Sequence, residues 1–369
     1  MRIVIITIID NINIGTYLQA LALGTVLNRK GCDVEIIDYQ RKHETVSAEV
    51  KVALGKNLIK MVYNLFYGVW RNAYQKRQYH KFVSKSISFT PIRYKTFESL
   101  KNNTPEADIY LTGSDQVWNS IHNRGVDKAY YLDFAPSEKT RAAYGASIGM
   151  DKFPAQEIKE TTTLLSKYDY LSVREFGAKK ILSDLAFSDV EIVMDPTLLL
   201  RKTDWESMIN KNETSEDYLL IYTVETKKEN AIIEKIAKKI AKLHGLKLYN
   251  VSYFDAMHGF TFCDRNFCRA TPNMFLNLML HAKFVIASSF HGTAFAINFN
   301  KQFLSISPNR FNSRVQSLLS LCKLENRLVT DDSFSVDGLK SISYDNVNKI
   351  LDIEREKSQE YIDKILNKN

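Results

Sequence analysis

The chain has little of the residues that dominate fibrous or disulfide-stapled proteins. Its 369 residues include 14 Gly, 7 Pro and 4 Cys. This low Gly and Pro content excludes collagen-like and low-complexity chains. The four cysteines are too irregularly placed for a disulfide framework: Cys32, Cys263, Cys268 and Cys322. Cys263 and Cys268 are five residues apart, but no second Cys or His pair stands at zinc-like spacing, so we expect no metal site.

Long apolar runs are also absent. The apolar start, residues 1–9, is too short for a signal peptide and is followed by Asp10 and Asn11. No stretch approaches the ~18–20 apolar residues that a membrane-spanning helix needs. We therefore expect a reduced, cytoplasmic protein. With 45% hydrophobic residues the chain can bury a sizeable core, and its length favours two domains at roughly 100–200 residues each.

The formal net charge of +8 belongs to one segment. Residues 41–95 hold twelve Lys or Arg and only two Glu, so a segment of +10 leaves −2 for the remainder. This segment is rich in aromatics and is predicted to be helical. One interpretation is a peripheral contact with an anionic membrane face near an acceptor site. The other is a solvated helical face with a buried aromatic side. No known nucleic-acid-binding module is present, so we expect no nucleic-acid partner.

The remaining sequence alternates between strands and helices. An apolar β-branched run over residues 1–9, a helix to Gly31 and a strand over 33–38 predict a right-handed βαβ unit. Further strands are predicted at 107–112, 141–147, 168–173 and 190–194. A second series has strands at 218–224, 246–251, 284–287 and 303–306, and a charged helix at 344–366.

Two such series predict an α/β protein with two Rossmann-like, doubly wound domains facing a cleft. We expect an N-terminal domain over 1–197, with a basic insertion at about 41–95. A C-terminal domain follows over 198–343, and a helical segment over 344–369.

Ligands of open α/β sheets bind beyond the carboxyl ends of the strands, so the loops there are candidate sites. The first holds Asn13, Gly15, Thr16 and Gln19, where a helix N-terminus and a Gly favour an anion or a sugar hydroxyl. A simple helix-start turn is the alternative. The second loop holds Ser114, Asp115, Gln116 and Trp118. Asp115 is a candidate base and Trp118 a sugar platform, or the loop is a polar turn over a core Trp.

Three further positions carry candidate charges. Arg174 stands at a strand-to-helix junction and can hold a carboxylate or phosphate, or form a surface pair with Glu175. His291 follows a buried strand, between Ser289 and the pair Gly292 and Thr293, and can act as an acid or bind phosphate. Arg310 and Arg314 are four residues apart before a helix, where they form either an anion clamp or an exposed turn.

Together these stretches resemble the polysaccharide pyruvyl transferase family. The matching pieces, in the family's order, are NIGTYLQALAL, YLTGSDQVWN, AYGAS, LSVREFGAKKIL, VMDPTLLL, TPNMFLNLMLHAKFVIASSFHGTAFAINFNKQF and RFNSRVQSLLSLCKLENR. They cover most of residues 11–327, and SSFHGTAFAINF is the most specific. The resemblance implies a GT-B-like fold. It also implies transfer of pyruvate from phosphoenolpyruvate to two hydroxyls of a sugar of a cell-surface polysaccharide or its precursor, giving a cyclic ketal and free phosphate. This reaction has no role for a cofactor.

By the same resemblance, Arg174 matches an arginine that contacts phosphoenolpyruvate, and His291 matches a histidine that binds the donor and serves as acid. One position departs from the family: many members have Arg-Leu-His where this chain has Ser289, Phe290 and His291. Either Arg310 or Arg314 supplies that charge, or the donor is held differently. Two other functions fit the same cleft: a glycosyltransferase using a nucleotide sugar, and a non-catalytic family member. The acceptor sugar and the oligomeric state are not readable from the sequence.

Overall fold

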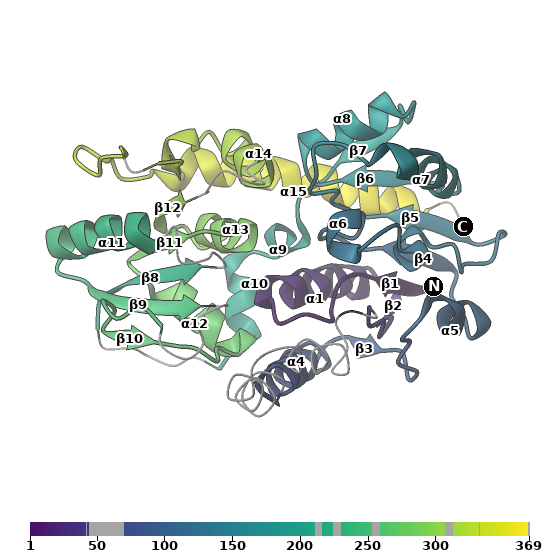
Figure 1. Cartoon of the computed structure of the whole chain (residues 1–369), viewed down its shortest axis with the longest axis horizontal. Helices are drawn as coiled ribbons and strands as arrows, with labels where there is room; N and C mark the ends of the chain where they lie inside the picture. Colours follow the sequence, from purple (N-terminus) through teal and green to yellow (C-terminus); the bar gives the residue numbers. More distant parts are fainter. Residues whose placement is uncertain are drawn as a thin grey trace. The chain divides into compact units, whose positions relative to one another are not determined.

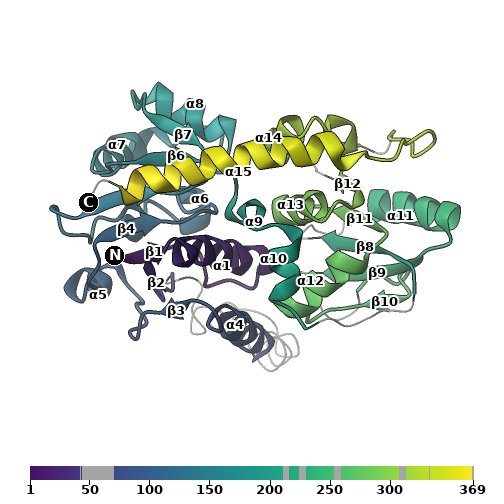
Figure 2. The same cartoon turned by 180° about the vertical axis from the view of Figure 1, so that it is seen from behind.

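The computed structural model describes residues 1–41, 43, 70–210, 216–223, 230–252, 259–306, 313–331 and 333–367. The chain divides into two compact units. Unit 1 comprises Met1–Pro196 and Ser358–Asn369, and unit 2 comprises Thr197–Lys357. The division falls one residue before the predicted boundary. The predicted third segment is not separate, because helix α15 (Tyr344–Leu366) begins in unit 2 and ends in unit 1 as one continuous helix (Figure 2).

Unit 1 is built on parallel strands. A five-stranded sheet has the order β3-β2-β1-β4-β5, and β6 pairs with β7 in a second sheet. Isolated bridges from Ala142 to Tyr170 and from Ala146 to Val173 continue the order from β5 to β6. The strands are β1 (Arg2–Ile6), β2 (Asp33–Ile36), β3 (Ser88–Phe89), β4 (Ile109–Thr112), β5 (Thr140–Ala143), β6 (Leu171–Val173) and β7 (Val190–Ile192).

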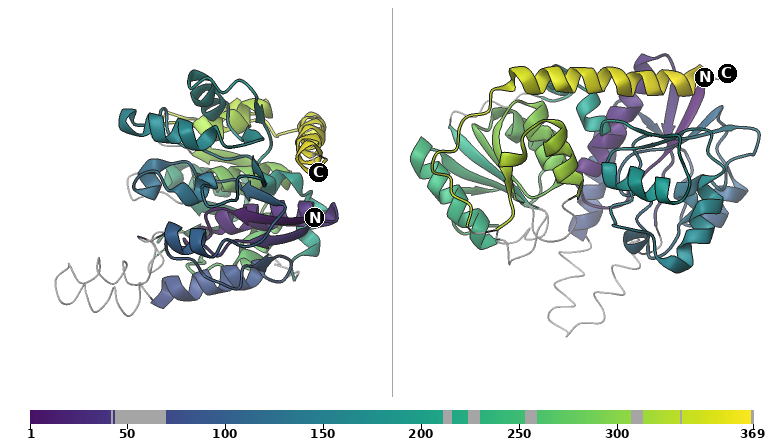
Figure 3. Two further views of the ribbon diagram at one scale, coloured as in Figure 1. Left: turned by 90° about the vertical axis from the view of Figure 1, so that its right-hand side faces the viewer. Right: turned by 90° about the horizontal axis from the view of Figure 1, so that it is seen from above.

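Helices cover this unit because its central strands are apolar on both faces. Val4 and Ile6 of β1 pack into a core with residues of η3, α7 and α8, while the alternate Ile3 and Ile5 are equally buried. Figure 3 shows the last turns of α15, in yellow, beside the purple elements, and Lys30 after α1 pairs with Asp363 at 2.5 Å. The helices are α1 (Ile14–Arg29), α4 (Trp70–Val83), α5 (Phe97–Asn102), α6 (Ser120–Asn123), η3 (Lys128–Tyr131), η4 (Ala155–Glu157), α7 (Ile158–Leu165) and α8 (Phe176–Asp184).

Unit 2 repeats the same topology in one six-stranded parallel sheet of order β10-β9-β8-β11-β12-β13. Its strands are β8 (Tyr218–Thr223), β9 (Lys247–Ser252), β10 (Arg265–Asn266), β11 (Phe284–Ala287), β12 (Gln302–Ile306) and β13 (Leu328–Val329). Its helices are α9 (Pro196–Leu199), α10 (Lys202–Ser207), α11 (Asn230–His244), α12 (Pro272–His281), α13 (Phe290–Asn298), α14 (Ser313–Leu321) and η5 (Glu325–Arg327).

Alternation along β8 separates the two faces of this sheet. Leu219 and Ile221 pack with α11, while Tyr222 stacks obliquely on Phe275 of α12 on the other face (Figure 1). Helix α12 begins as its sequence predicts, because the Thr271 side chain accepts from Met274 N and Pro272 occupies the first turn. The structure thus confirms a mixed α/β fold with parallel sheets and a C-terminal helix.

The predicted basic insertion is only partly within the described residues. Within the insertion, the sequence predicts one helical stretch at 52–70 and another at 72–83. The first lies almost wholly outside the described residues, and the second is part of α4. In α4, Tyr79 is buried in an edge-on contact with Tyr17 of α1, and Arg77 and Lys81 are exposed. Across the part of the chain that the structure describes, no helix is both long and apolar enough to span a bilayer.

Candidate functional site

The strand order places a switch point in each sheet, where consecutive helices leave to opposite faces. In unit 1 it lies between β1 and β4, which pair in parallel. In unit 2 it lies between β8 and β11. Ligands of doubly wound folds bind beyond the carboxyl ends of strands at this point. The loops after β1, β4 and β11 contain most of the residues that the sequence marks as candidates.

A buried polar cluster stands at the carboxyl edge of the unit 1 strands, centred on Arg174. Its side chain is fully buried, and Nη1 lies 2.5 Å from Asp195 Oδ2 and 3.1 Å from Ser114 Oγ. Nη2 lies 3.3 Å from Asp115 Oδ1, and Nε lies 3.6 Å from Glu175 Oε2. Burial opposes the charged form, but the three carboxylates prevail and raise the pKa of Arg174 above its ordinary value.

This arrangement corrects one of the two sequence interpretations of Arg174, the surface pair with Glu175. The pair with Glu175 exists, but it is buried rather than on the surface, and Asp195 is the closer partner. The guanidinium is engaged by protein carboxylates, so a donor phosphate would reach it only if those side chains moved. The donor contact of Arg174 stays a prediction. What the structure shows is that Arg174 joins three strand ends into one network.

Asp115 has a backbone conformation that non-glycine residues rarely adopt. Its φ is +77°, in the left-handed region, directly after β4. Such strain persists only where the surroundings hold it. Here the Asp115 carbonyl accepts from Val117 N and Ser147 N, and its carboxylate accepts from Gln116 N at 2.9 Å. The turn aims the carboxylate at Arg174, which fits a group placed for chemistry rather than for packing.

Two neighbours of Asp115 differ in burial, Gln116 being half-buried and Trp118 fully buried. Gln116 is half-buried, and its Oε1 accepts from Asn119 Nδ2 at 2.9 Å. Trp118 corrects the sequence interpretation: its indole is fully buried, stacks on Tyr131 and donates to the Tyr130 carbonyl. A ring with no exposed face is not a sugar platform. For Trp118 the alternative interpretation is correct: the loop is a polar turn over an aromatic core residue.

The start of α1 forms a third group of candidates beside Asp115. Asn13 is half-buried and caps the helix by accepting from Gly15 N at 3.0 Å. Gln19 is fully buried and donates to Thr7 Oγ1, which in turn donates to the Ser114 carbonyl. The loops after β1 and β4 are therefore linked by hydrogen bonds. Thr16 is also fully buried.

In unit 2 the candidate histidine lies at the N-terminus of α13. Ser289 caps this helix, and its Oγ accepts from Gly292 N at 3.0 Å. His291 follows in the first turn and is 4% exposed, with its ring edge-on to Phe290. Gly292 is required by close packing, because a Cβ there would lie 2.7 Å from the ring of Tyr222. The helix N-terminus favours negative charge next to the imidazole.

Other predicted donor residues fall differently. The prediction that Thr293 binds the donor is wrong. Thr293 is fully buried, and its hydroxyl contacts the Ser289 carbonyl and Ser305 Oγ at 3.0 and 2.8 Å. A hydroxyl used in this way holds the turn and does not face a ligand. Arg314 is half-buried in the first turn of α14, while Arg310 lies outside the described residues. The replacement for the family arginine at position 289 stays a prediction.

Sequence reasoning missed two members of the unit 1 cluster. Asp195 precedes Pro196, a sequence typical of a domain edge, yet its side chain is fully buried against Arg174. Ser147 donates to Glu175 Oε1 at 2.7 Å, which fixes that carboxylate. Asp195 follows a predicted strand, as Ser114 and Arg174 do, and Ser147 is the last residue of one, so a polar residue at a strand end was the available signal. Within the described ranges, no three His, Cys, Asp or Glu side chains are arranged to hold a metal ion.

Comparison with solved structures shows the fold. UDP-GlcNAc 2-epimerase from Methanocaldococcus jannaschii, solved with UDP-GlcNAc and UDP, is 14% identical, with a TM-score of 0.55 and 100% of each chain covered. The Neisseria meningitidis enzyme bound to UDP-GlcNAc is 9% identical, with a TM-score of 0.52, covering 98% of this chain and 100% of that one. These likenesses support a GT-B-like fold and, at such low identity, nothing further.

Sequence comparison identifies the family. No curated protein matches the chain. The family profile for polysaccharide pyruvyl transferase matches residues 13–310, which include the loops after β1, β4, β6 and β11 and all but one of the candidate residues. The match covers far more than half of the 369 residues. The chain therefore belongs to the polysaccharide pyruvyl transferase family.

Proposed function

We propose that this chain transfers pyruvate from phosphoenolpyruvate to two hydroxyls of one sugar, releasing phosphate and forming a cyclic ketal. The sugar belongs to a cell-surface polysaccharide or to a precursor of it. The observation that carries the proposal is His291, an almost fully buried imidazole in the first turn of α13 at the switch point of the unit 2 sheet. Membership of the family supports a transferase.

The chemistry needs an acid at the methylene carbon of the enol ester. When His291 donates a proton there, the adjacent carbon becomes oxocarbenium-like and a sugar hydroxyl attacks it. The bond between this carbon and the phosphate oxygen then breaks and phosphate leaves. The second sugar hydroxyl attacks the same carbon and closes the ketal. Each sugar hydroxyl loses one proton. One of these protons restores the imidazole, and the other goes to a base or to the phosphate. No electron transfer occurs, so side chains and charge are sufficient for this route.

Anion binding at the N-terminus of α13 supports the placement of the donor. The helix has nine residues and is capped by Ser289, whose hydroxyl accepts from Gly292 N and keeps its own proton to donate. The phosphate and carboxylate of phosphoenolpyruvate carry more negative charge than one helix end neutralises. We propose that Arg314 adds a cation, with Arg310 as the alternative, in place of the family arginine at position 289.

Asp115 is the proposed base for the attacking hydroxyl. Its strained backbone and its contact with Arg174 hold the carboxylate at the carboxyl end of β4. We assign Arg174 the role of positioning Asp115, in addition to the donor contact that the family resemblance implies. Half-buried Asn13 and Gln116 are the proposed hydrogen-bonding partners of the acceptor, with Gly15, Thr16, Gln19 and Ser114 shaping the loops beneath them.

The test compares two histidines of unit 2. His291→Ala is expected to lower phosphate release from phosphoenolpyruvate by about 10²–10⁴-fold, the usual contribution of a positioned acid. His281→Ala is the matched control, because His281 is half-buried on α12 and its Nδ1 lies 2.8 Å from the Asn277 carbonyl of the same helix. The measurement is phosphate release with a panel of saccharide acceptors. Near wild-type turnover of His291→Ala would overturn the assignment.

A further inference from the structure

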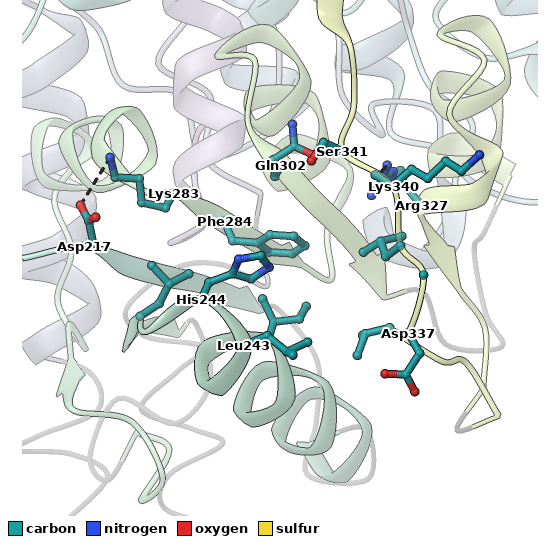
Figure 4. Close-up of a pocket in the computed structure, with 15 residues that line it drawn as sticks. Asp217, Leu243, His244, Lys283, Phe284, Gln302, Arg327, Asp337, Lys340 and Ser341 are labelled. Carbon is teal, nitrogen blue, oxygen red and sulfur yellow. Dashed lines mark hydrogen bonds and ion pairs between the residues drawn. The ribbon is translucent and has the colours of Figure 1, made fainter.

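Unit 2 has a second concave site, at the edge of its sheet opposite to His291. A pocket of about 610 Å³ opens at the amino ends of β8, β11 and β12. Figure 4 shows Phe284 and Leu243 in its middle, with Lys283 and Asp217 at one end and Arg327 and Lys340 at the other. Strand β11 begins here at Phe284 and ends at Ala287, before the loop to His291. The pocket is therefore separate from the proposed donor site.

The floor of this pocket is apolar. Ile240, Leu243 and Leu246 come from the end of α11 and the turn after it, and Phe284 from β11. Leu243 is 62% exposed, although it stands among hydrophobic neighbours that are mostly buried. An apolar side chain left open to solvent at a pocket gains free energy when an apolar group covers it.

One end of the pocket holds a buried positive charge. Arg327 is 2% exposed and donates through Nη2 to the Lys340 carbonyl. Its Nε is buried without a hydrogen-bond partner among the described residues. Burial lowers the pKa of Arg327 below its ordinary value, as expected for a guanidinium held away from water. A buried charge in this state is costly unless an anion accompanies it.

The carboxylates that line the pocket do not supply that anion. Asp217 pairs with Lys283 at 3.4 Å, and Asp337 pairs with Lys239 at 2.6 Å. Lys340, an exposed residue that also lines the pocket, adds a further positive charge beside Arg327. The pocket thus combines an apolar floor with excess positive charge at one end.

We propose that this pocket binds a small organic anion: a carboxylate or phosphate group carried on a compact apolar body. The anionic group meets Arg327 and Lys340, and the apolar body lies on Leu243 and Phe284. The pocket volume is within the range of about 300–1,000 Å³ that small-molecule sites occupy. Phosphoenolpyruvate lacks an apolar body, so this ligand is distinct from the proposed donor.

Calorimetric titration of the full chain tests the proposal, with phenyl phosphate and benzoate as probes and inorganic phosphate as the comparison. Both aromatic probes are expected to bind saturably, and more tightly than inorganic phosphate. Leu243→Asp changes an exposed residue, so folding should be retained, and it should weaken both probes by about tenfold. Arg327→Lys should weaken them as well, since a lysine lacks the planar fork that meets carboxylate and phosphate.

Two control variants separate this site from general charge and from catalysis. Lys152→Gln removes an exposed cation of unit 1, and His291→Ala removes the proposed acid; neither should change probe affinity by more than about twofold. Absence of saturable binding would overturn the proposal. So would equal affinity for inorganic and phenyl phosphate, or unchanged affinity in Leu243→Asp.

Discussion

At the scale of single residues, the guanidinium of Arg174 is surrounded by more negative charge than it neutralises. Asp195, Asp115 and Glu175 all lie within 3.6 Å of its nitrogens, and the side chains of Arg174 and Asp195 are fully buried. Such a cluster is stable only while the cation is present, because each carboxylate then has a partner. We therefore expect Arg174 to act on Asp115 through both charge and position.

A double-mutant cycle measures this coupling. Arg174→Met should reduce the free energy of unfolding by about 3–5 kcal/mol, because it leaves buried carboxylates without a counter-charge. Adding Asp195→Asn should recover part of the loss, with a coupling energy of about 1–3 kcal/mol. Lys180→Met is the control, because its ion pair with Asp184 is more than 60% exposed on both sides and should contribute little. Simple additivity of the two buried changes would contradict the network.

Residue identity alone did not predict which polar or aromatic side chains face solvent. The sequence placed Asp115, Arg174 and His291 correctly at strand ends, because a polar residue after an apolar run marks that position. Trp118 was misread, since an indole serves equally as a sugar platform and as a core residue until burial is known. Thr293 was misread for the same reason, because a hydroxyl next to a helix start also caps and braces the turn.

At the scale of elements, long periodic segments were predicted and short edge segments were not. The helix at 344–366 was predicted with the bounds of α15, because its charged and apolar residues alternate over six turns. The edge strands β3, β10 and β13 have two residues each, which is too short for any pattern. Their pairing is determined by the neighbouring strand rather than by their own residues. The helices at 97–102 and 202–207 were missed for similar reasons of length.

Packing between β8 and α13 yields a prediction at this scale. Gly292→Ala places a Cβ 2.7 Å from the Tyr222 ring and 3.0 Å from Ala287 Cβ, so the helix must shift. The free energy of unfolding should fall by about 1–3 kcal/mol, measured by urea denaturation. Gly177→Ala in α8 is the matched control, because nothing lies within 4 Å of its added Cβ and alanine favours helix. Equal stability of the two variants would show that α13 has room to move.

At the scale of the whole molecule, the positive charge is unevenly distributed along the sequence. Residues 41–95 carry a net charge of +10 and the rest of the chain −2, and α4, which lies in this segment, exposes Arg77 and Lys81. We propose that the segment brings the enzyme to anionic membranes where lipid-linked acceptors are found. Each basic residue near such a surface contributes about 1 kcal/mol, so a few suffice for weak, salt-sensitive binding.

Co-sedimentation with liposomes checks this proposal. The wild-type chain should pellet with vesicles containing an anionic phospholipid and not with neutral vesicles, and added salt should release it. Replacing Arg77, Lys81 and Lys85 by glutamine should reduce the bound fraction. The control replaces exposed Lys152, Lys159 and Lys180, elsewhere in unit 1, in the same way. Binding that is equal for anionic and neutral vesicles, or equal for both triple variants, would remove the membrane contact.

The central claim concerns the donor, because the fold alone accommodates nucleotide sugars as well. The M. jannaschii and N. meningitidis proteins of the same fold were solved with UDP-GlcNAc, at identities too low to extend that ligand to this chain. The most direct measurement is calorimetric titration of the wild-type chain with phosphoenolpyruvate and, separately, with UDP- and GDP-sugars. We expect saturable binding of phosphoenolpyruvate that is lost in His291→Ala, and no binding of the nucleotide sugars. Binding of a nucleotide sugar without any binding of phosphoenolpyruvate would contradict it.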